Sequence, residues 1–511
     1  MVSFSFGKKN DDVMKNSVII AIASLLANAF NYLFYMYTAK VLGPEKYGIF
    51  GTLLSIYFIF FFLTNIVNYV IIEYVAYFKA KIQLDKTRRL FDFLIKAMTL
   101  AGFVIFLILL VISGKLANLI HLNSSTPIIA LGLFLWAYIV FNTIVGMLNG
   151  LQKFAALGTG RVIDGFFTLL FGIIFLNLNM GIAGGMFALF FAALLTIPFV
   201  IVPLRFLFNI QPAKIGDIGI FSYVAKALIP SIFIAIMLNI DVILAKIFLS
   251  PIEAGYFAAA SLMGKLVFFI SVGVLSVIFP KAAELHSNGE ETTPLLKDGL
   301  IYTGAIGFFI SFLFLLFPGF FAHTLFGQEY AIDNLIGIYS LAATFLSLTN
   351  VFVMYNLAVR KFGITVMLIP FTALQIAAIS VFHSSALQIL VFEVAIMALM
   401  FVSIVYFNKE DFVKLFVQTT GYRRYPISAY LKVKTGERDD MPTSSNKIHI
   451  KEVEEFMPYN EYERMGEELE NKKTINDEDE KEKIFRDIVK DIVMIKNKPV
   501  NPKSKKTKKQ Q

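Results

Sequence analysis

The 511-residue sequence contains no cysteine, only five histidines and a small share of charged residues. Without cysteine, the chain forms no disulfide and has no thiol chemistry. No two histidines have the spacing of metal ligands on one helix, so neither a metal site nor a cofactor is expected. Charged residues make up 16% of the chain and hydrophobic residues 57%, which excludes an ordinary soluble domain and indicates a multi-pass membrane protein.

The formal net charge of +9 does not indicate nucleic-acid binding. Much of it lies in loops between apolar segments and in the last dozen residues, where basic side chains orient a membrane protein and contact anionic lipid. The expected partner of these residues is therefore the lipid bilayer.

A proline-glycine turn occurs twice in the chain. The segment LGPEKYGIF at residues 42–50 returns as LSPIEAGYF at residues 249–257, so that Pro44 and Pro251 are 207 residues apart. A second landmark, NGLQK at residues 149–153, returns as NLAVR at residues 356–360 with the same offset. Proline ends or redirects a helix and glycine permits a tight reversal, which favours a structural role for both turns. Two landmarks in one register predict a duplicated membrane domain.

Apolar runs predict twelve transmembrane helices, each long enough to cross about 30 Å of hydrocarbon. They are 17–38, 47–72, 90–112, 126–148, 160–176, 182–203, 224–248, 255–279, 300–320, 334–357, 362–381 and 386–407. The first resembles a signal peptide in its basic flank but has no cleavage site, so it is expected to span the membrane. The predicted fold is all-α: an N-terminal six-helix half (residues 1–210) and a C-terminal six-helix half (residues 211–408) around a central cavity.

Basic residues are concentrated in the loops that follow even-numbered spans, beginning with Lys79, Lys81, Arg88 and Arg89. This distribution predicts that both termini are cytoplasmic. Because six is even, the halves share one orientation and are related by an axis along the membrane normal. Residues 409–511 form a charged cytoplasmic tail, expected to be largely disordered; it contacts anionic lipid or, alternatively, docks a partner.

Several motifs resemble those of the oligosaccharide and polysaccharide flippases of the multidrug/oligosaccharidyl-lipid/polysaccharide export superfamily. They are AKVLGPEKYG at 39–48, LNGLQKF at 148–154, Ile229-Pro230 followed by Asn239-Ile240-Asp241, and FGQEY at 326–330. The resemblance covers about residues 17–407 and leaves the tail outside. It implies a prokaryotic plasma-membrane protein that flips a polyprenyl-linked glycan from the cytoplasmic to the outer leaflet by alternating access, for polysaccharide assembly, without enzymatic chemistry.

Two charges lie deep in predicted spans seven and eight. Asp241 is about 10 Å from the outer end of one, and Lys265 about 15 Å along the next. Charges inside a bilayer are costly, so these two either pair with each other or line a wet cavity between the halves. Lys265 is the best candidate to bind a substrate phosphate, because its ammonium is a compact donor.

Other ionisable residues are weaker candidates. Glu393 in span twelve, Asp241 and the more superficial Glu73 are candidates to bind a coupling proton or sodium ion, although Glu73 suits an ordinary interface charge. Arg161 and Lys226 either snorkel to headgroups or form a cationic vestibule for an anionic lipid head.

Four asparagines place amides in the first two spans. Asn28 and Asn31 share one helical face, as do Asn65 and Asn68. They either hydrogen-bond between helices or bind sugar hydroxyls.

Four alternatives to the oligosaccharide flippase remain open. One is a purely structural or partner-organising membrane protein that acts through the tail, although it would not need the buried charges. A cation-coupled multidrug exporter of the same superfamily would use Asp241 and Glu393 as an acidic cavity. A peptidoglycan-precursor flippase typically has more spans. A membrane glycan polymerase or ligase needs large outer loops, and the loops here are short.

Overall fold

The computed structural model describes residues 6–213, 220–287, 291–359, 361, 363 and 365–408. Within these ranges every regular element is a helix, which confirms the all-α expectation. All belong to the first of two compact units, Met1–Val413. The predicted tail lies outside the described residues, as does the side chain of Lys226.

The twelve predicted spans are present. Among the described residues, ten candidate spans are long and apolar enough to cross a membrane, and α13 adds a shorter one. The first of the ten, Ile22–Lys79, is 58 residues long and folds back at a kink. The elements are α1 (Phe6–Ala80), α2 (Leu84–Leu119), α3 (Thr126–Gly150), α4 (Phe154–Asn177), α5 (Gly181–Ile201), η1 (Val202–Leu204), α6 (Arg205–Phe208), α7 (Ile220–Met237), α8 (Ile240–Phe248), α9 (Pro251–Ser287), α10 (Thr293–Leu316), α11 (Pro318–Phe326), α12 (Asp333–Ala358), α13 (Thr365–Val381) and α14 (Ala386–Phe407).

The repeated turn separates two helices in each half. In α1 the non-helical residue is Gly43, with φ 69° and ψ 169°, a conformation that glycine adopts without steric cost. Pro44 follows it at the start of the second helix, where its missing N–H is not needed. In the second copy, Leu249 is extended and Pro251 begins α9. The sequence therefore located both turns correctly.

The seventh span differs from the prediction, because it is not one continuous helix over 224–248. α7 ends at Met237 and α8 begins at Ile240, so the helix is broken at Leu238 and Asn239. The Asn239 side chain donates a hydrogen bond to the Ala235 carbonyl oxygen at 2.9 Å, in competition with the helical backbone pattern. Several other helices run beyond their predicted ends by a turn or two: α1 to Ala80 and α9 to Ser287.

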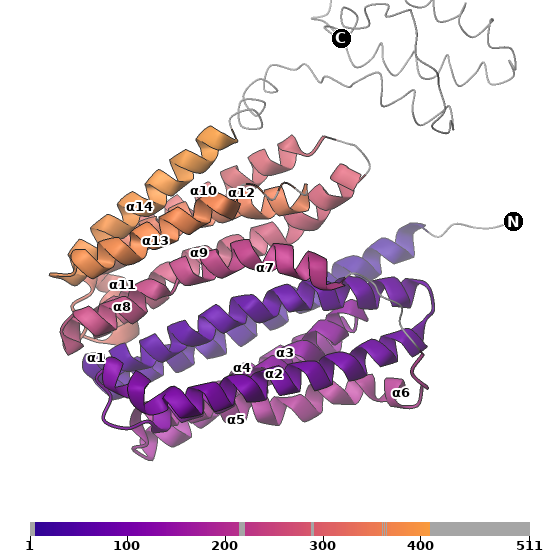
Figure 1. The fold of residues 1–511 in the computed structure, drawn as a ribbon, viewed down its shortest axis with the longest axis horizontal. Helices are drawn as coiled ribbons and strands as arrows, with labels where there is room; N and C mark the ends of the chain where they lie inside the picture. Colours follow the sequence, from indigo (N-terminus) through magenta and orange to yellow (C-terminus); the bar gives the residue numbers. More distant parts are fainter. Residues whose placement is uncertain are drawn as a thin grey trace, which may run out of the picture. The chain divides into compact units, whose positions relative to one another are not determined.

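The helices form two groups, α1–α6 and α7–α14, as Figure 1 shows. In the first group α4 packs on α1 and α5, and α3 packs on α1, α2 and α5. In the second, α12 packs on α9, α10 and α14. The groups meet where α1 contacts α7, α8, α9 and α11.

Residues that are 207 positions apart meet where the two groups join. A Cβ on Gly48 would lie 2.9 Å from the Gly255 nitrogen, and one on Gly51 would lie 2.6 Å from the Ala258 Cβ. Phe62 stacks on Phe269 with ring centroids 6.4 Å apart and an interplanar angle of 8°. These contacts keep one register over about 21 Å of helix, so α1 and α9 run parallel on either side of a pseudo-two-fold axis along the helices.

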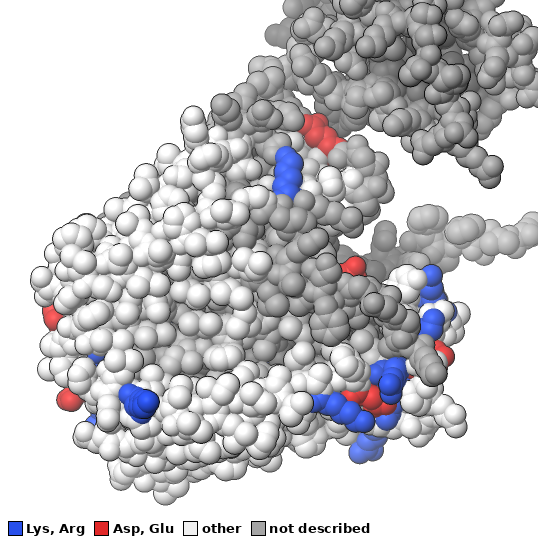
Figure 2. Space-filling view, in the orientation of Figure 1, with Lys and Arg blue, Asp and Glu red and all other residues white. Residues whose placement is uncertain are grey.

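The flank of the bundle carries few charged side chains. Figure 2 shows a broad white face, with most of the visible Lys and Arg at the end where α6 lies. At that end Lys79 donates hydrogen bonds to the Leu151 carbonyl oxygen and to Gln152 Oε1 at 2.8 and 2.9 Å. A basic residue at this end thus links the ends of α1 and α3 by hydrogen bonds. The cytoplasmic orientation of this end stays a prediction.

Candidate functional site

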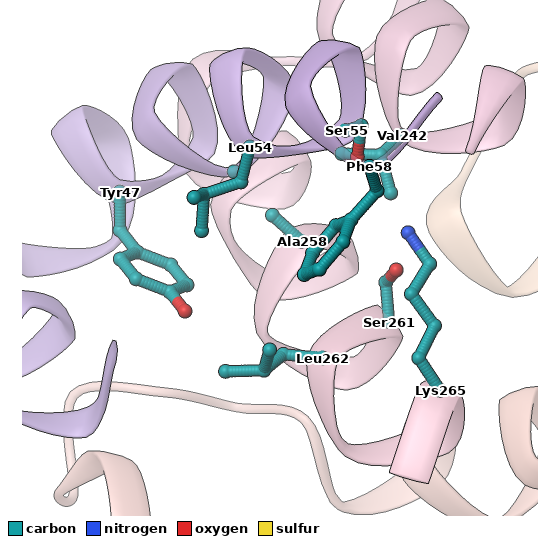
Figure 3. Close-up of a pocket in the computed structure, with 10 residues that line it drawn as sticks. Tyr47, Leu54, Ser55, Phe58, Val242, Ala258, Ser261, Leu262 and Lys265 are labelled. Atoms are coloured by element: carbon teal, nitrogen blue, oxygen red, sulfur yellow. The ribbon is translucent and has the colours of Figure 1, made fainter. Parts of the chain in front are cut away.

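A small pocket lies between the two groups of helices (Figure 3). Its walls come from α1, α8 and α9. Eight of the ten lining residues form four pairs that are each 207 positions apart: Gly51 with Ala258, Leu54 with Ser261, Ser55 with Leu262, and Phe58 with Lys265. The pocket therefore lies on the pseudo-two-fold axis, with Tyr47 and Val242 completing its lining.

The pairs are related by position but not by chemistry. Where α1 contributes the ring of Phe58, α9 contributes the ammonium of Lys265, and the two lie 5.9 Å apart from centroid to nitrogen. Of the described lining residues, Lys265 alone is charged. Figure 3 shows Lys265 and Ser261 projecting from one helix toward Phe58 of the other. One half thus supplies the only positive charge to a pocket that both halves build.

The same ammonium also belongs to a buried polar cluster in the C-terminal half. Lys265 Nζ donates a hydrogen bond to Asn239 Oδ1, at the break between α7 and α8, at 3.0 Å. Two residues along, Asp241 Oδ2 accepts a hydrogen bond of 2.6 Å from the Tyr339 hydroxyl of α12. That hydroxyl accepts one of 3.0 Å from Ser261 of α9. The helix break therefore positions the polar side chains of α8, α9 and α12 around one point.

Two further helices reach the break. Gln375 of α13 donates from Nε2 to the Met237 carbonyl oxygen at 3.0 Å and to Glu393 Oε1 of α14 at 3.5 Å. Asp241 and Gln375 are fully buried and Glu393 is 3% exposed. Asp241, Lys265 and Glu393 all interact electrostatically.

The cluster contains more acceptors than donors. Asp241 Oδ1, Gln375 Oε1 and Glu393 Oε2 are buried atoms without a hydrogen-bond partner. A buried unpaired acceptor is costly, and a bound proton or cation would satisfy it. The direct ion pair expected as one alternative for Asp241 and Lys265 is not present among the described residues. Instead, the Lys265 ammonium donates to Asn239 and the Asp241 carboxylate accepts from Tyr339.

The other predicted site residues lie elsewhere. Arg161 of α4 donates from Nη1 to Ser24 Oγ of α1 at 3.4 Å, in the N-terminal half. Glu73 is exposed near the end of α1, as an interface charge would be. The structure therefore brings together Asp241, Lys265 and Glu393 and leaves Arg161 and Glu73 outside their cluster.

The asparagines divide into two kinds. Asn28 is exposed and Asn31 half-buried on the first part of α1. Asn65 donates a hydrogen bond to the Phe61 carbonyl oxygen of its own helix at 2.9 Å. Asn68 is buried beside Gly146, whose Cβ would lie 2.4 Å from Asn68 Oδ1. Asn28 therefore has the most exposed side chain of the four, and Asn68 is buried.

Sequence reasoning did not count Asn239, Tyr339 and Gln375 among the site residues. All three are polar residues within predicted apolar spans, and a search for uncharged polar residues at mid-span depth would have included them. Nothing in the sequence, however, pairs Gln375 with Met237, because that contact depends on the break in span seven.

One end of the pocket is closed by the repeated turns. The Tyr330 hydroxyl, beyond α11, donates to the Ala39 carbonyl oxygen at 2.8 Å. The Tyr47 ring packs on Phe326 and Tyr330, with centroids 6.2 and 6.1 Å apart. The FGQEY motif thus joins the C-terminal half to the kink in α1, and its aromatic residues pack rather than face a ligand.

Toward the other end, four phenylalanines meet across the axis: Phe61 and Phe62 of α1 with Phe268 and Phe269 of α9. Their contacts are reciprocal, with Phe61 6.4 Å from Phe269 and Phe62 5.8 Å from Phe268. The pocket therefore lies between packed turns on one side and packed rings on the other.

Comparison with known proteins adds a family and a fold. The family model described as "Polysaccharide biosynthesis protein" matches residues 13–286. No curated protein matches the sequence significantly.

Solved structures similar to this chain are transporters. An inward-facing multidrug resistance MATE family transporter of the MOP superfamily has 14% identity and a TM-score of 0.62, covering 80% of this chain and 100% of that chain. A MOP superfamily transporter from Pyrococcus furiosus has 14% identity and a TM-score of 0.59, covering 78% of this chain and 95% of that chain. An outward-facing MATE family transporter has 15% identity and a TM-score of 0.58, covering 78% and 96%. At these identities the likeness shows the fold alone.

Proposed function

Because the chain belongs to the polysaccharide biosynthesis protein family and has the fold of a MOP superfamily transporter, we propose that it flips a polyprenyl-linked oligosaccharide across the membrane. In this proposal the glycan moves from the cytoplasmic to the outer leaflet of a prokaryotic plasma membrane. Both termini are cytoplasmic, as the distribution of basic residues predicts.

The observation that carries the proposal is the ammonium of Lys265 in a pocket shared by both halves. A polyprenyl-linked sugar carries phosphate between its lipid and its glycan, and that phosphate is the part that oil excludes most strongly. A lysine ammonium is a compact partner for it. The Ser55 hydroxyl adds a hydrogen-bond donor to the same pocket, whereas the Ser261 hydroxyl donates to Tyr339.

The size of the pocket requires movement of the halves. In this state the pocket has room for about one water molecule, so an oligosaccharide does not fit. The two halves contact each other along α1 and α9, and rocking about these contacts would open the pocket to one side at a time. The glycan enters the widened space while its lipid remains in the bilayer.

Residues outside the pocket support the passage of the head group in this proposal. Asn28 and Asn31, on the more exposed part of α1, offer amides to sugar hydroxyls, and Asn65 and Asn68 line the same helix farther on. Arg161 and Lys226 are the further candidates to supply positive charge to an anionic lipid head.

The carboxylates of Asp241 and Glu393 supply the coupling step. Their unpartnered oxygens are suited to a proton or a sodium ion in the membrane interior. Glu73, exposed near the end of α1, is the weakest of the three predicted ion-coupling residues.

Export of the glycan by variants of Lys265 tests the proposal. Lys265→Ala is expected to abolish export while the protein remains in the membrane, and Lys265→Arg to keep part of it, since a cation persists in a different geometry. Lys115→Ala, an exposed lysine of α2, is the control and should export normally. If Lys265→Ala/Asp241→Ala exports as well as the wild type, the ammonium only balances a charge and the proposal is wrong.

A multidrug exporter is the second candidate, because the similar structures include multidrug resistance transporters and the C-terminal half holds two buried carboxylates. Drug resistance conferred by the wild type and lost in Asp241→Asn, with no effect on surface glycan, would favour it.

A further inference from the structure

The ammonium of Lys265 occupies two environments at once. It lines the pocket between the halves, and it donates to Asn239 inside the polar cluster. The pocket has no second positive charge among its described lining residues. An anion in the pocket and the carboxylates of the cluster therefore compete for interaction with the same positive charge, the Lys265 ammonium.

The cluster has more negative than positive charge when both carboxyl groups are ionised. Asp241 and Glu393 then oppose Lys265 alone, and the three unpartnered acceptor oxygens have no donor. In this state the cluster has a net negative charge, which repels an anion that enters the pocket. One bound proton makes the cluster neutral and also turns an unpartnered oxygen into a donor.

We propose that proton uptake by Asp241 and Glu393 frees the Lys265 ammonium for a phosphate in the pocket, so that protons and the anionic head group bind together. The inference rests on the proposed function, which supplies the anion. Linkage makes the coupling reciprocal: a bound anion draws protons onto the cluster to the same degree that protons strengthen anion binding.

The remaining titratable groups around the cluster do not carry this role. Tyr339 of α12 donates a hydrogen bond to Asp241, and Tyr47 of α1 lines the far side of the pocket. Lys246 of α8 interacts with Glu45 at the turn end of α1. Gln375 of α13 does not titrate.

Binding of a soluble probe to the purified full-length protein tests the inference. The probe is a diester of diphosphoric acid, whose two negative charges stay fixed between about pH 5 and pH 9. We expect its affinity to rise as pH falls, by up to about tenfold per pH unit where one proton is taken up. Calorimetry in two buffers of different ionisation enthalpy should show that uptake directly.

Variants show which residues cause the pH dependence of probe binding. Asp241→Asn/Glu393→Gln should bind the probe tightly at every pH with no proton uptake, and Lys265→Gln should not bind it. Asp164→Asn, which changes a carboxyl of α4 in the other half, is the matched control and should keep the wild-type pH dependence. If the double variant has a lower melting temperature than the wild type, Glu393→Gln alone should take up fewer protons on binding the probe.

The outcomes separate the two claims. Wild-type affinity that does not vary with pH overturns the coupling and leaves the pocket as an anion site. Persistent pH dependence in the double variant, or unchanged binding by Lys265→Gln, also overturns it. Absence of probe binding by the wild type at any pH overturns the anion site on which the proposed function depends.

Discussion

A close approach between the halves, at Gly255, provides a sharp prediction. An added Cβ at Gly255 of α9 would lie 2.0 Å from the Pro44 carbonyl oxygen and 2.5 Å from its carbon. Both are backbone atoms, so no flexible side chain can move aside. Gly255→Ala therefore requires the two turns to separate by about 1 Å or more, and overpacking of this kind costs about 1–3 kcal/mol.

That cost applies only while the turn ends are packed together. A state in which the two turn ends separate is free of this overpacking cost. Gly255→Ala should therefore shift the population toward that open state by roughly 5- to 150-fold. Because the chain has no native cysteine, Ser55→Cys in the pocket gives a clean reporter. We expect a membrane-impermeant maleimide to label it faster in the Gly255→Ala background.

Gly114→Ala is the matched control, since a Cβ there meets no heavy atom within 4 Å. It should leave labelling unchanged and stabilise α2 by about 0.5–1 kcal/mol through helix propensity. Equal labelling and equal melting temperatures for Gly255→Ala and Gly114→Ala would refute the contact between the turns as the closed end of the pocket.

Three further predictions follow from the same contacts. In Gly51→Cys/Ala258→Cys the two Cβ atoms would lie 2.6 Å apart, about 1 Å less than the Cβ–Cβ distance of a disulfide. This variant should cross-link under oxidant and stop transport until a reductant is added, and failure to cross-link contradicts the axial pairing. Tyr330→Phe should lower the free energy of unfolding by about 1 kcal/mol through one lost hydrogen bond, measured by melting, whereas the exposed Tyr302→Phe should not. Truncation after Lys414 should leave a monodisperse protein in detergent, because the tail is poor in large apolar residues; aggregation on size exclusion would show that the bundle needs it.

The repeat allowed more to be predicted than hydropathy alone. An offset of 207 identified Gly48 and Gly255 as equivalent positions, and Phe58 and Lys265 follow at the same offset. Equivalence does not by itself imply contact, because most equivalent residues of two halves lie far from the axis. Only the packing of α1 on α9 shows that these pairs touch across it.

The sequence also identified the buried charges but not their partners. Asp241, Lys265 and Glu393 were candidates because an ionisable residue within an apolar span is rare and costly. Direct pairing was one alternative for Asp241 and Lys265, but they form no salt bridge among the described residues: the ammonium donates to Asn239 and the carboxylate accepts from Tyr339. Those partners become available only when the seventh span breaks.

The sequence by itself determined the twelve spans, the two turns and the membrane class. Each is a local property: a run of about 20 apolar residues spans a bilayer, and proline or glycine interrupts it, whatever the rest of the chain does. The polar cluster is different, because α8, α9, α12, α13 and α14 each contribute to it. Its members come from Asn239 to Glu393 along the chain, and no local pattern specifies which helix faces which. The tertiary structure decided that, since helix–helix packing sets which side of each helix turns toward the others.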